Sequence, residues 1–132
     1  MRKPLILLAA ANLSGCGTLM EPPKHVTNQW GGPHISLLLE GGLGHIEYDC
    51  ATGTIDSPLV PGRDGSFTAI GTHRPGSGGP VRVGQIFTSH RATYSGTLVK
   101  DQMTLTAQLE DGTVIGPFSL VRGAEGQLMR CL

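Results

Sequence analysis

The sequence has few charged residues, few aromatic residues and no long apolar run. Charged residues make up 15% of the 132 residues, with 10 Lys and Arg against 10 Asp and Glu, and aromatic residues make up 5%. Basic residues do not cluster and do not alternate with aromatic ones, so the chain lacks the usual pattern of a nucleic-acid-binding surface. We therefore expect no nucleic acid among its partners. The apolar segment Leu5–Ala11 is far shorter than the roughly 20 residues that a membrane-spanning helix needs.

The motifs of common active sites are also missing from the sequence. It contains no Gly-x-Ser-x-Gly, no His-Glu-x-x-His, no phosphate-binding glycine loop and no Cys-x-x-Cys. We therefore expect a protein that is not an enzyme and that carries no cofactor.

The first residues predict export from the cytoplasm. Arg2 and Lys3 precede the short apolar segment Leu5–Ala11, and small residues follow it, which is the order of a signal peptide. The next four residues, Leu13-Ser14-Gly15-Cys16, resemble the lipobox of bacterial lipoproteins. The alternative is an ordinary secretory signal in which Cys16 occurs by chance.

The lipobox resemblance implies both the processing and the location of the chain. Residues 1–15 would be removed, and Cys16 would become an acylated first residue. Two or more acyl chains hold a protein stably on a bilayer, whereas one binds only marginally. The lipid bilayer is therefore an expected partner. In such lipoproteins an Asp after the cysteine favours the inner membrane, so Gly17 implies the outer membrane, with the protein facing the periplasm.

The remaining cysteines predict a disulfide bond. With Cys16 acylated, Cys50 and Cys131 form an even pair in an oxidising compartment. A bond between them closes a loop of 131 − 50 = 81 residues, which predicts roughly 4 kcal/mol of stabilisation from reduced chain entropy. The alternative is two buried free thiols.

The mature chain reads as a tether followed by one β domain. Residues 16–29 contain Pro22-Pro23 and show no hydrophobic period, so they predict a lipidated tether. From Trp30 to the end at residue 132, short alternating runs are separated by Gly, Asp and Pro. Two such runs, 35–40 and 43–50, flank Gly41-Gly42, which indicates a tight hairpin because glycine readily adopts positive φ.

The clearest strands lie in the C-terminal half. We predict strands near 94–98, 103–109 and 114–121, with turns at Lys100-Asp101 and Asp111-Gly112 and a bulge at Pro117. Weaker patterns indicate strands at 54–60, from 67, at 81–87 and at 128–131. Eight or nine short strands with tight turns predict an all-β domain, either a small antiparallel up-and-down β-barrel or a sandwich. We favour the barrel because closure removes the exposed sheet edges.

Two groups of polar residues are candidate sites. His45, Glu47 and Asp49 alternate along one strand and share a face, and imidazole with carboxylate suits zinc, so His45 and Glu47 are candidate metal ligands. Charged residues on an outward strand face are also the normal solvated surface.

The second group flanks the Gly- and Pro-rich segment 75–80. His73 and Arg74 precede this segment, and His90 and Arg91 follow the next predicted strand. If the two ends meet at one rim of the barrel, these four residues would contact an anionic partner. The alternative is that they are ordinary solvent-facing residues beside loops.

The domain resembles two groups of proteins, the first over nearly its whole length and the second over two short segments. It looks like a group of small bacterial lipoproteins, on the segments Trp30-Gly31-Gly32-Pro33-His34-Ile35, Asp49-Cys50-Ala51-Thr52-Gly53-Thr54-Ile55-Asp56, Tyr94-Ser95-Gly96, Met103-Thr104-Leu105-Thr106, Gly116-Pro117-Phe118-Ser119-Leu120 and Cys131-Leu132. Residues 48–53 and 91–95 are similar to segments of the membrane-bound inhibitors of c-type lysozyme, which are disulfide-stapled β-barrel lipoproteins. The order of residues in the second segment differs, and the later Trp-x-Lys-Gly element of those inhibitors is absent because Trp30 is the sole Trp.

These observations predict a non-enzymatic envelope lipoprotein that presents a small β-barrel for binding a protein, either envelope-bound or secreted, or an envelope ligand. Three alternatives stay open. The first is an inhibitor of lysozyme or another hydrolase, the second is a metal-binding protein or enzyme that uses His45 and Glu47, and the third is a structural part of an envelope assembly.

Overall fold

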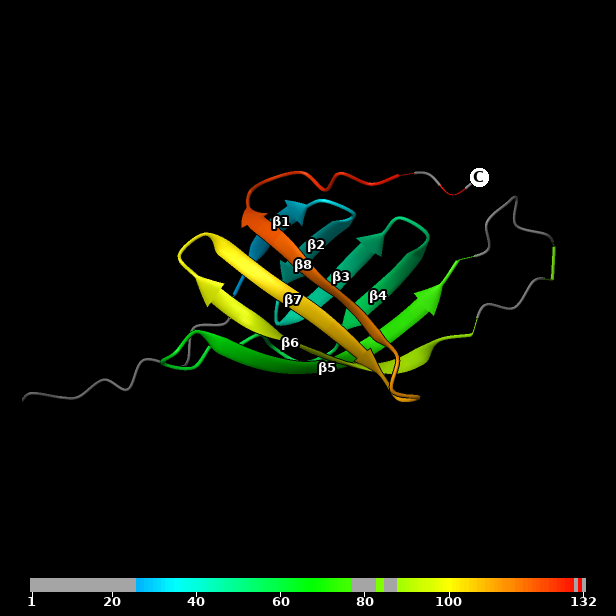
Figure 1. Ribbon diagram of the computed structural model, residues 1–132, viewed down its shortest axis with the longest axis horizontal. Coiled ribbons are helices and arrows are strands. Elements are labelled where there is room, and N and C mark those ends of the chain that lie inside the picture. Colours follow the sequence, from blue (N-terminus) through cyan, green and yellow to red (C-terminus); the bar gives the residue numbers. More distant parts are fainter. Residues whose placement is uncertain (1–25, 77–82, 85–87, 130, 132) are drawn as a thin grey trace, which may run out of the picture.

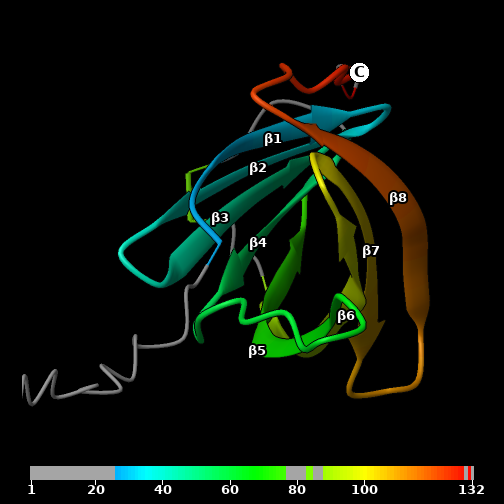
Figure 2. The ribbon, with the colours of Figure 1, turned by 90° about the vertical axis from the view of Figure 1, so that its left-hand side faces the viewer.

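A computed structural model describes residues 26–76, 83–84, 88–129 and 131, which form an eight-stranded antiparallel barrel (Figures 1 and 2). The strands follow one another around the barrel in sequence order, and β1 pairs with β8 to close it. Among the described residues, no helix has the length and hydropathy needed to cross a membrane. The strands are β1 (Asn28–Gly32), β2 (Ile35–Glu40), β3 (Leu43–Tyr48), β4 (Ala51–Ile55), β5 (Ser66–Pro75), β6 (His90–Val99), β7 (Gln102–Leu109) and β8 (Val114–Arg122). The predicted all-β barrel is confirmed.

Alternation along each strand separates the core from the outer wall. In β7, Met103, Leu105 and Ala107 are buried, whereas the residues between them are more exposed, which is the period of two expected of a strand with one face buried. The same alternation in the other strands fills the centre of the barrel with apolar side chains. The buried apolar residues are Trp30, Ile35, Leu37, Leu39, Ile46, Tyr48, Ile55, Leu59, Phe67, Ala69, Ala92, Tyr94, Met103, Leu105, Ala107 and Leu120.

Several turns form where the sequence predicts them. Gly41 and Gly42 both have positive φ, +58° and +82°, between β2 and β3, as a tight hairpin requires. Lys100-Asp101 and Asp111-Gly112 lie in the turns on either side of β7. The β7–β8 register shifts between Leu105 and Ala107, opposite Pro117, so the predicted bulge is also confirmed.

Three predicted strands differ in the structure. The strand expected at 54–60 instead spans Ala51–Ile55; beyond it the Ile70 N–H donates to the Ser57 hydroxyl instead of to a strand carbonyl, and Pro58, which has no N–H to donate, lies outside the strand. Leu128 and Met129 lie outside any strand, with Met129 exposed. Of the strand expected at 81–87, only residues 83 and 84 are described, and they form a turn.

One strand is missing from the sequence prediction. Residues 28 and 29, expected in the tether, belong to β1, in which Trp30 is fully buried and lies under the Arg122 guanidinium, 4.6 Å from the ring centroid. Only two residue pairs, Trp30 with Arg122 and Gly31 with Val121, join β1 to β8. The first half of β8 therefore continues beyond the end of β1.

The two ends of the barrel differ in which turns they carry and in where the chain enters. The chain enters at one end, where the Val26 N–H donates to the Leu59 carbonyl and where the β2–β3 and β6–β7 turns lie. The opposite end carries the β1–β2 and β3–β4 turns, and we call it the disulfide end because Cys50 lies in the β3–β4 turn. Antiparallel pairing fixes this arrangement, since each strand reverses direction.

After β8, the chain forms what we call the C-terminal strap, the described residues of 123–131. Gly123 donates to the Gln29 carbonyl, and Gln127 pairs with Gly32 and His34 through backbone hydrogen bonds, so the strap runs beside β1 and β2 (Figure 1). It reaches the β3–β4 turn, where Cys131 is bonded to Cys50 with a Cα–Cα distance of 5.4 Å. The predicted disulfide is present, and it joins the strap, not a last strand, to the barrel.

Candidate functional site

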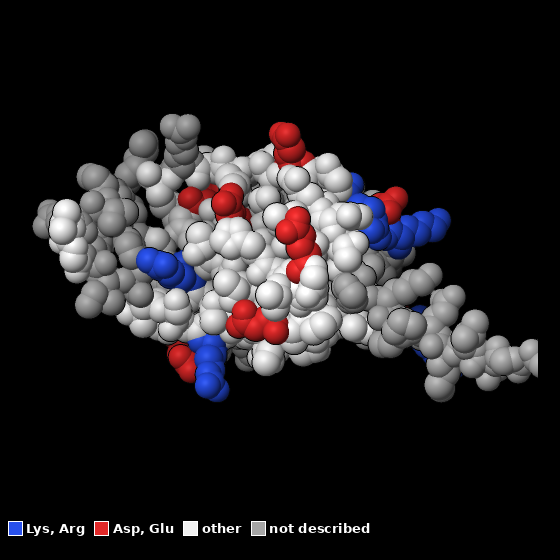
Figure 3. Space-filling view, turned by 180° about the vertical axis from the view of Figure 1, so that it is seen from behind, with Lys and Arg blue, Asp and Glu red and all other residues white. Residues whose placement is uncertain are grey.

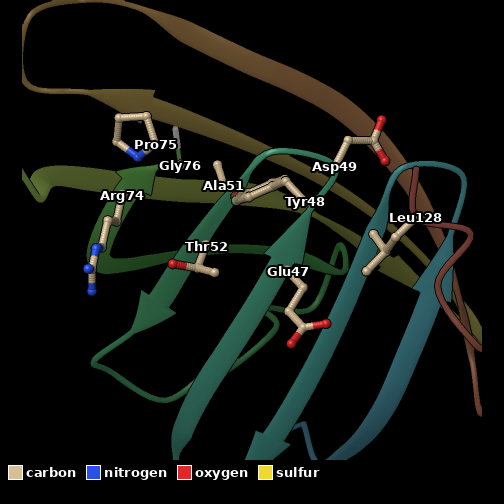
Figure 4. A pocket seen from close by; sticks show the side chains of 9 residues that line it. All are labelled: Glu47, Tyr48, Asp49, Ala51, Thr52, Arg74, Pro75, Gly76 and Leu128. Atoms are coloured by element: carbon tan, nitrogen blue, oxygen red, sulfur yellow. The ribbon is translucent and has the colours of Figure 1, made fainter. Parts of the chain in front are cut away.

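Two pockets meet at the disulfide end of the barrel. The first, which we call the mouth pocket, has a volume of about 280 Å³ and is lined by His34, Tyr48, Asp49, Cys50, Ala51, His73, Ile115 and Phe118. The second, the outer pocket, measures about 390 Å³ and is lined by Glu47, Tyr48, Asp49, Ala51, Thr52, Arg74, Pro75, Gly76 and Leu128 (Figure 4). Tyr48, Asp49 and Ala51 belong to both, so the pockets lie on either side of the β3–β4 turn.

The mouth pocket exists because three strands end or diverge at this place. β3 ends at Tyr48 with its side chain facing inward, and β5 carries His73 on its inner face, where His73 is 6% exposed. Phe118 lies in the part of β8 that has no pairing with β1. The inner face of the barrel is therefore accessible beside these three rings.

Ring contacts hold the pocket wall together. The Tyr48 ring centroid lies 5.2 Å from that of His73 and 5.4 Å from that of Phe118, both in tilted geometry. Aromatic pairs at such separations and tilts are attractive. The wall is therefore a preformed aromatic surface.

Two polar atoms of these side chains make no hydrogen bond of good geometry among the described residues. They are the Tyr48 hydroxyl and His73 Nδ1, both of which are buried. Burial without a hydrogen bond costs a polar group roughly 1–3 kcal/mol, which native structures normally avoid. The Tyr48 hydroxyl lies beside the Tyr94 side chain, which acts on it as a hydrogen-bond neighbour, so His73 Nδ1 is the more isolated of the two atoms.

Burial also fixes the charge of these side chains. Loss of solvation, and then the charge of nearby His90, lowers the pKa of His73, so its imidazole is neutral at pH 7. Burial, and then the neighbouring Tyr94, raises the pKa of Tyr48 far above its ordinary range. The inner wall of the mouth pocket is therefore uncharged but polar.

The rim of the mouth pocket is fixed by Asp49. One carboxylate oxygen lies 2.6 Å from His34 Nδ1, and the other accepts a hydrogen bond of 2.8 Å from the Met129 backbone N–H in the strap. The Met129 hydrogen bond is the main cause that lowers the pKa of Asp49, and its hydrogen bond to His34 and the charge of His34 lower it further. The Cys50–Cys131 bond lies directly beside this group.

The outer pocket is lined by charged side chains of both signs. Glu47 pairs in register with Thr52 on β4, and Thr52 pairs with Arg74 on β5, so a carboxylate and a guanidinium flank a hydroxyl across three strands (Figure 4). Charges of both signs are also distributed over the back of the barrel (Figure 3).

The structure separates the four residues predicted to contact an anion. His73 and His90 are register partners on the inner faces of β5 and β6, whereas Arg74 and Arg91 are exposed on the outer faces. His90 Nδ1 lies 3.9 Å from the Glu110 carboxylate. The four residues therefore do not converge on one site, although His73 and Arg74 line the mouth pocket and the outer pocket respectively.

The predicted metal ligands remain a pair on the outer wall. His45 Nε2 lies 3.8 Å from Glu47 Oε1, and both side chains are more than half exposed. Asp49, predicted on the same face, instead lies in the β3–β4 turn and interacts with His34. Among the described residues, no group of three or more His, Cys, Asp and Glu is placed to hold a metal ion.

Sequence reasoning missed Tyr48, His34 and Phe118 as site residues. It placed Tyr48 on the inner face of its strand, but nothing in the sequence indicates that β8 diverges from β1 and leaves that face accessible. The segment Arg91–Ser95, which is similar to part of the lysozyme inhibitors, lies within β6 with Ala92 and Tyr94 buried.

No protein-family model matches the chain, and comparisons with curated proteins and with solved structures found no similar protein.

Proposed function

We propose that the protein is a non-enzymatic lipoprotein of a bacterial envelope and that it binds its partner at the disulfide end of a small β-barrel. Acyl chains on Cys16 would hold it on the membrane, and a protein or envelope ligand would bind at the mouth pocket. The observation that carries the binding role is the preformed aromatic wall of the mouth pocket, in which the Tyr48 ring packs against those of His73 and Phe118.

The filled interior favours a shallow site over a carrier cavity. Trp30, Tyr94 and Leu105, at most 1% exposed, contribute to the apolar core of the barrel. An eight-stranded barrel is just wide enough for its own side chains to fill it. A ligand would therefore bind at the end of the barrel rather than inside it.

The chain path favours presentation of this end away from the membrane. The lipidated residue would precede β1, and β1 begins at the end of the barrel opposite the mouth pocket. The Val26–Leu59 hydrogen bond fixes the chain at that entry end. A partner would reach the mouth pocket without displacing the anchor.

Site-specific photocrosslinking in native envelopes tests this proposal. A photoreactive residue would replace Ala51, which lines both pockets, or Leu43, which is 59% exposed next to the β2–β3 turn at the opposite end. We expect an adduct of defined mass from position 51 and none from position 43. Equal adducts from both positions, or none from position 51, would contradict binding at the disulfide end.

A further inference from the structure

A patch of exposed aliphatic and basic side chains lies at the end of the barrel where the chain enters, the end that faces the viewer in Figure 2. The patch spans the β4–β5 loop, the β6–β7 turn and the end of β8. Its three valines are between 41% and 62% exposed. We call it the entry patch, and its members are Val60, Arg63, Val99, Lys100, Val121 and Arg122.

Strand register places two of these valines side by side. Val99 on β6 and Val121 on β8 both pair with Gln102 on β7, so the three residues form one row across three strands. Register partners project from the same face of a sheet, and both valines are exposed, so they form one strip on the outer wall. The Arg122 N–H donates to the Asp101 carbonyl, which holds the end of β8 against the β6–β7 turn.

The β4–β5 loop joins this strip to the point where the chain enters. The Leu98 N–H donates to the Gly65 carbonyl, so the loop lies against the end of β6. In the same loop, the Leu59 carbonyl accepts the hydrogen bond from the Val26 N–H, and Val60 is the next residue. The predicted tether therefore reaches the barrel beside the entry patch.

The charges of the entry patch favour a negatively charged surface. Its turns carry three basic residues, Arg63, Lys100 and Arg122, against the two carboxylates of Asp64 and Asp101. Asp101 pairs with Arg122 over 3.0 Å, whereas Arg63 and Lys100 form no ion pair among the described residues. Basic side chains beside exposed aliphatic ones are the combination with which proteins contact the headgroup region of a bilayer.

The length of the tether identifies the surface that this patch can reach. Cys16 precedes Val26 by 26 − 16 = 10 residues, which span at most about 35 Å. An acyl anchor on Cys16 would hold the entry patch within that distance of the bilayer, at an effective concentration in roughly the millimolar range. Weak contacts are sufficient at such a concentration.

We propose that the entry patch docks on the surface of an anionic bilayer, with its valines among the headgroups and with Arg63 and Lys100 against lipid phosphates. Docking fixes the orientation of the barrel, which a tether alone does not. The inference rests on the proposed membrane anchor, but its test supplies the anchor chemically and does not depend on acylation in the cell.

Paramagnetic broadening on nanodiscs measures the docking. The chain from Cys16 onward, which contains every described residue, is coupled through the Cys16 thiol to a maleimide lipid. Cys50 and Cys131 are bonded to each other, so Cys16 alone reacts. The nanodiscs contain phosphatidylglycerol and a lipid with a gadolinium chelate as its headgroup.

We expect the methyl signals of Val99 and Val121 to lose intensity while those of Leu43 keep it. Leu43 is the internal control, because it is 59% exposed at the same end but lies on the opposite side of the barrel, in a turn with Glu40 and without Lys or Arg. Equal loss at Val99 and Leu43, or no loss at either, would overturn the docking. Neither result bears on the acylation of Cys16 or on crosslinking at the disulfide end.

Charge reversal tests the basic residues of the patch. Lys100→Glu should lessen the loss at Val99, and adding Arg63→Glu should abolish it. Arg91→Glu, exposed on the outer wall of β6 near the disulfide end, is the matched control and should leave the loss unchanged.

Salt provides a second test if the double variant does not fold. About 1 M salt shortens the Debye length to about 3 Å, so it should abolish the loss at Val99 in the native chain. Selective loss at Val99 that survives high salt or the double charge reversal would contradict docking through Arg63 and Lys100.

Discussion

Asp49 and Met129, 80 positions apart in the sequence, are joined by a hydrogen bond in which the Met129 backbone N–H donates to the Asp49 carboxylate over 2.8 Å. This contact holds the C-terminal strap against the β3–β4 turn, one residue from Cys50. The rim of the mouth pocket therefore depends on a carboxylate and on a disulfide.

The Asp49 contact predicts an acid-sensitive strap. Because the folded state lowers the pKa of Asp49, mainly through the Met129 hydrogen bond, the ionised carboxylate stabilises the fold. This contribution is complete above the ordinary Asp pKa of about 3.9 and is lost as the pH falls through the lower folded value. Hydrogen exchange at the Met129 amide should therefore accelerate, relative to its intrinsic rate, from pH 5 to pH 2.

Asp49→Asn should show faster Met129 exchange already at pH 7, and its exchange protection should depend little on pH. Asp64→Asn is the matched control, because the pKa of Asp64 is also lowered, by Ser66, but Asp64 lies in a turn at the entry end. Equal protection of Met129 in the native chain and in Asp49→Asn would show that the carboxylate does not hold the strap.

The disulfide predicts a large loss of stability on removal. It closes 81 residues, so the paired substitution Cys50→Ser with Cys131→Ser should lower the free energy of unfolding by roughly 4 kcal/mol. Urea denaturation with and without reductant measures the loss. Reductant should lower the stability of the native chain to that of the double variant; a native chain insensitive to reductant would contradict a bond that stabilises the fold.

Gly53 on β4 lies where there is no room for a side chain, so a larger residue at this position should disturb the packing behind the pocket. A Cβ atom at this position would clash with the Tyr94 hydroxyl and lie 2.9 Å from the Thr72 carbonyl oxygen. We expect Gly53→Ala to destabilise the protein by about 1–3 kcal/mol, as overpacking does. Gly62→Ala, whose added Cβ comes no closer than 3.3 Å to its neighbours, is the control and should be nearly neutral.

Adding Tyr94→Phe to Gly53→Ala separates the two contacts. Removing the hydroxyl relieves the clash with it, so the double variant should lose less stability than the sum of the single changes. Additive losses would mean that the conflict with the Thr72 backbone dominates.

The sequence predicts most of the fold because its strands have one buried face. The alternation of Met103, Leu105 and Ala107 and the glycines of the β2–β3 hairpin are local signals, and the structure confirms both. β1 is not predictable in this way, because Gly31 and Gly32 leave Trp30 as its one apolar inward side chain, and so short a pattern does not differ from that of a tether.

The site is less predictable because it depends on contacts between distant segments. Tyr48, His73 and Phe118 come from three strands, and the pocket opens only because β1 stops short of the first half of β8. Alternation correctly assigns opposite faces to His73 and Arg74. Their position beside the segment 75–80 predicts that both contact one anionic partner, but the barrel wall lies between them.

The envelope role depends on the predicted lipid anchor at Cys16, and the mass of the N-terminal peptide tests this anchor most directly. We predict that protein extracted from membranes begins at Cys16 and carries acyl chains, and that Cys16→Ser releases it from the membrane fraction. An unmodified N-terminus at another residue, or a Cys16→Ser chain that remains bound to the membrane, would contradict the lipid anchor.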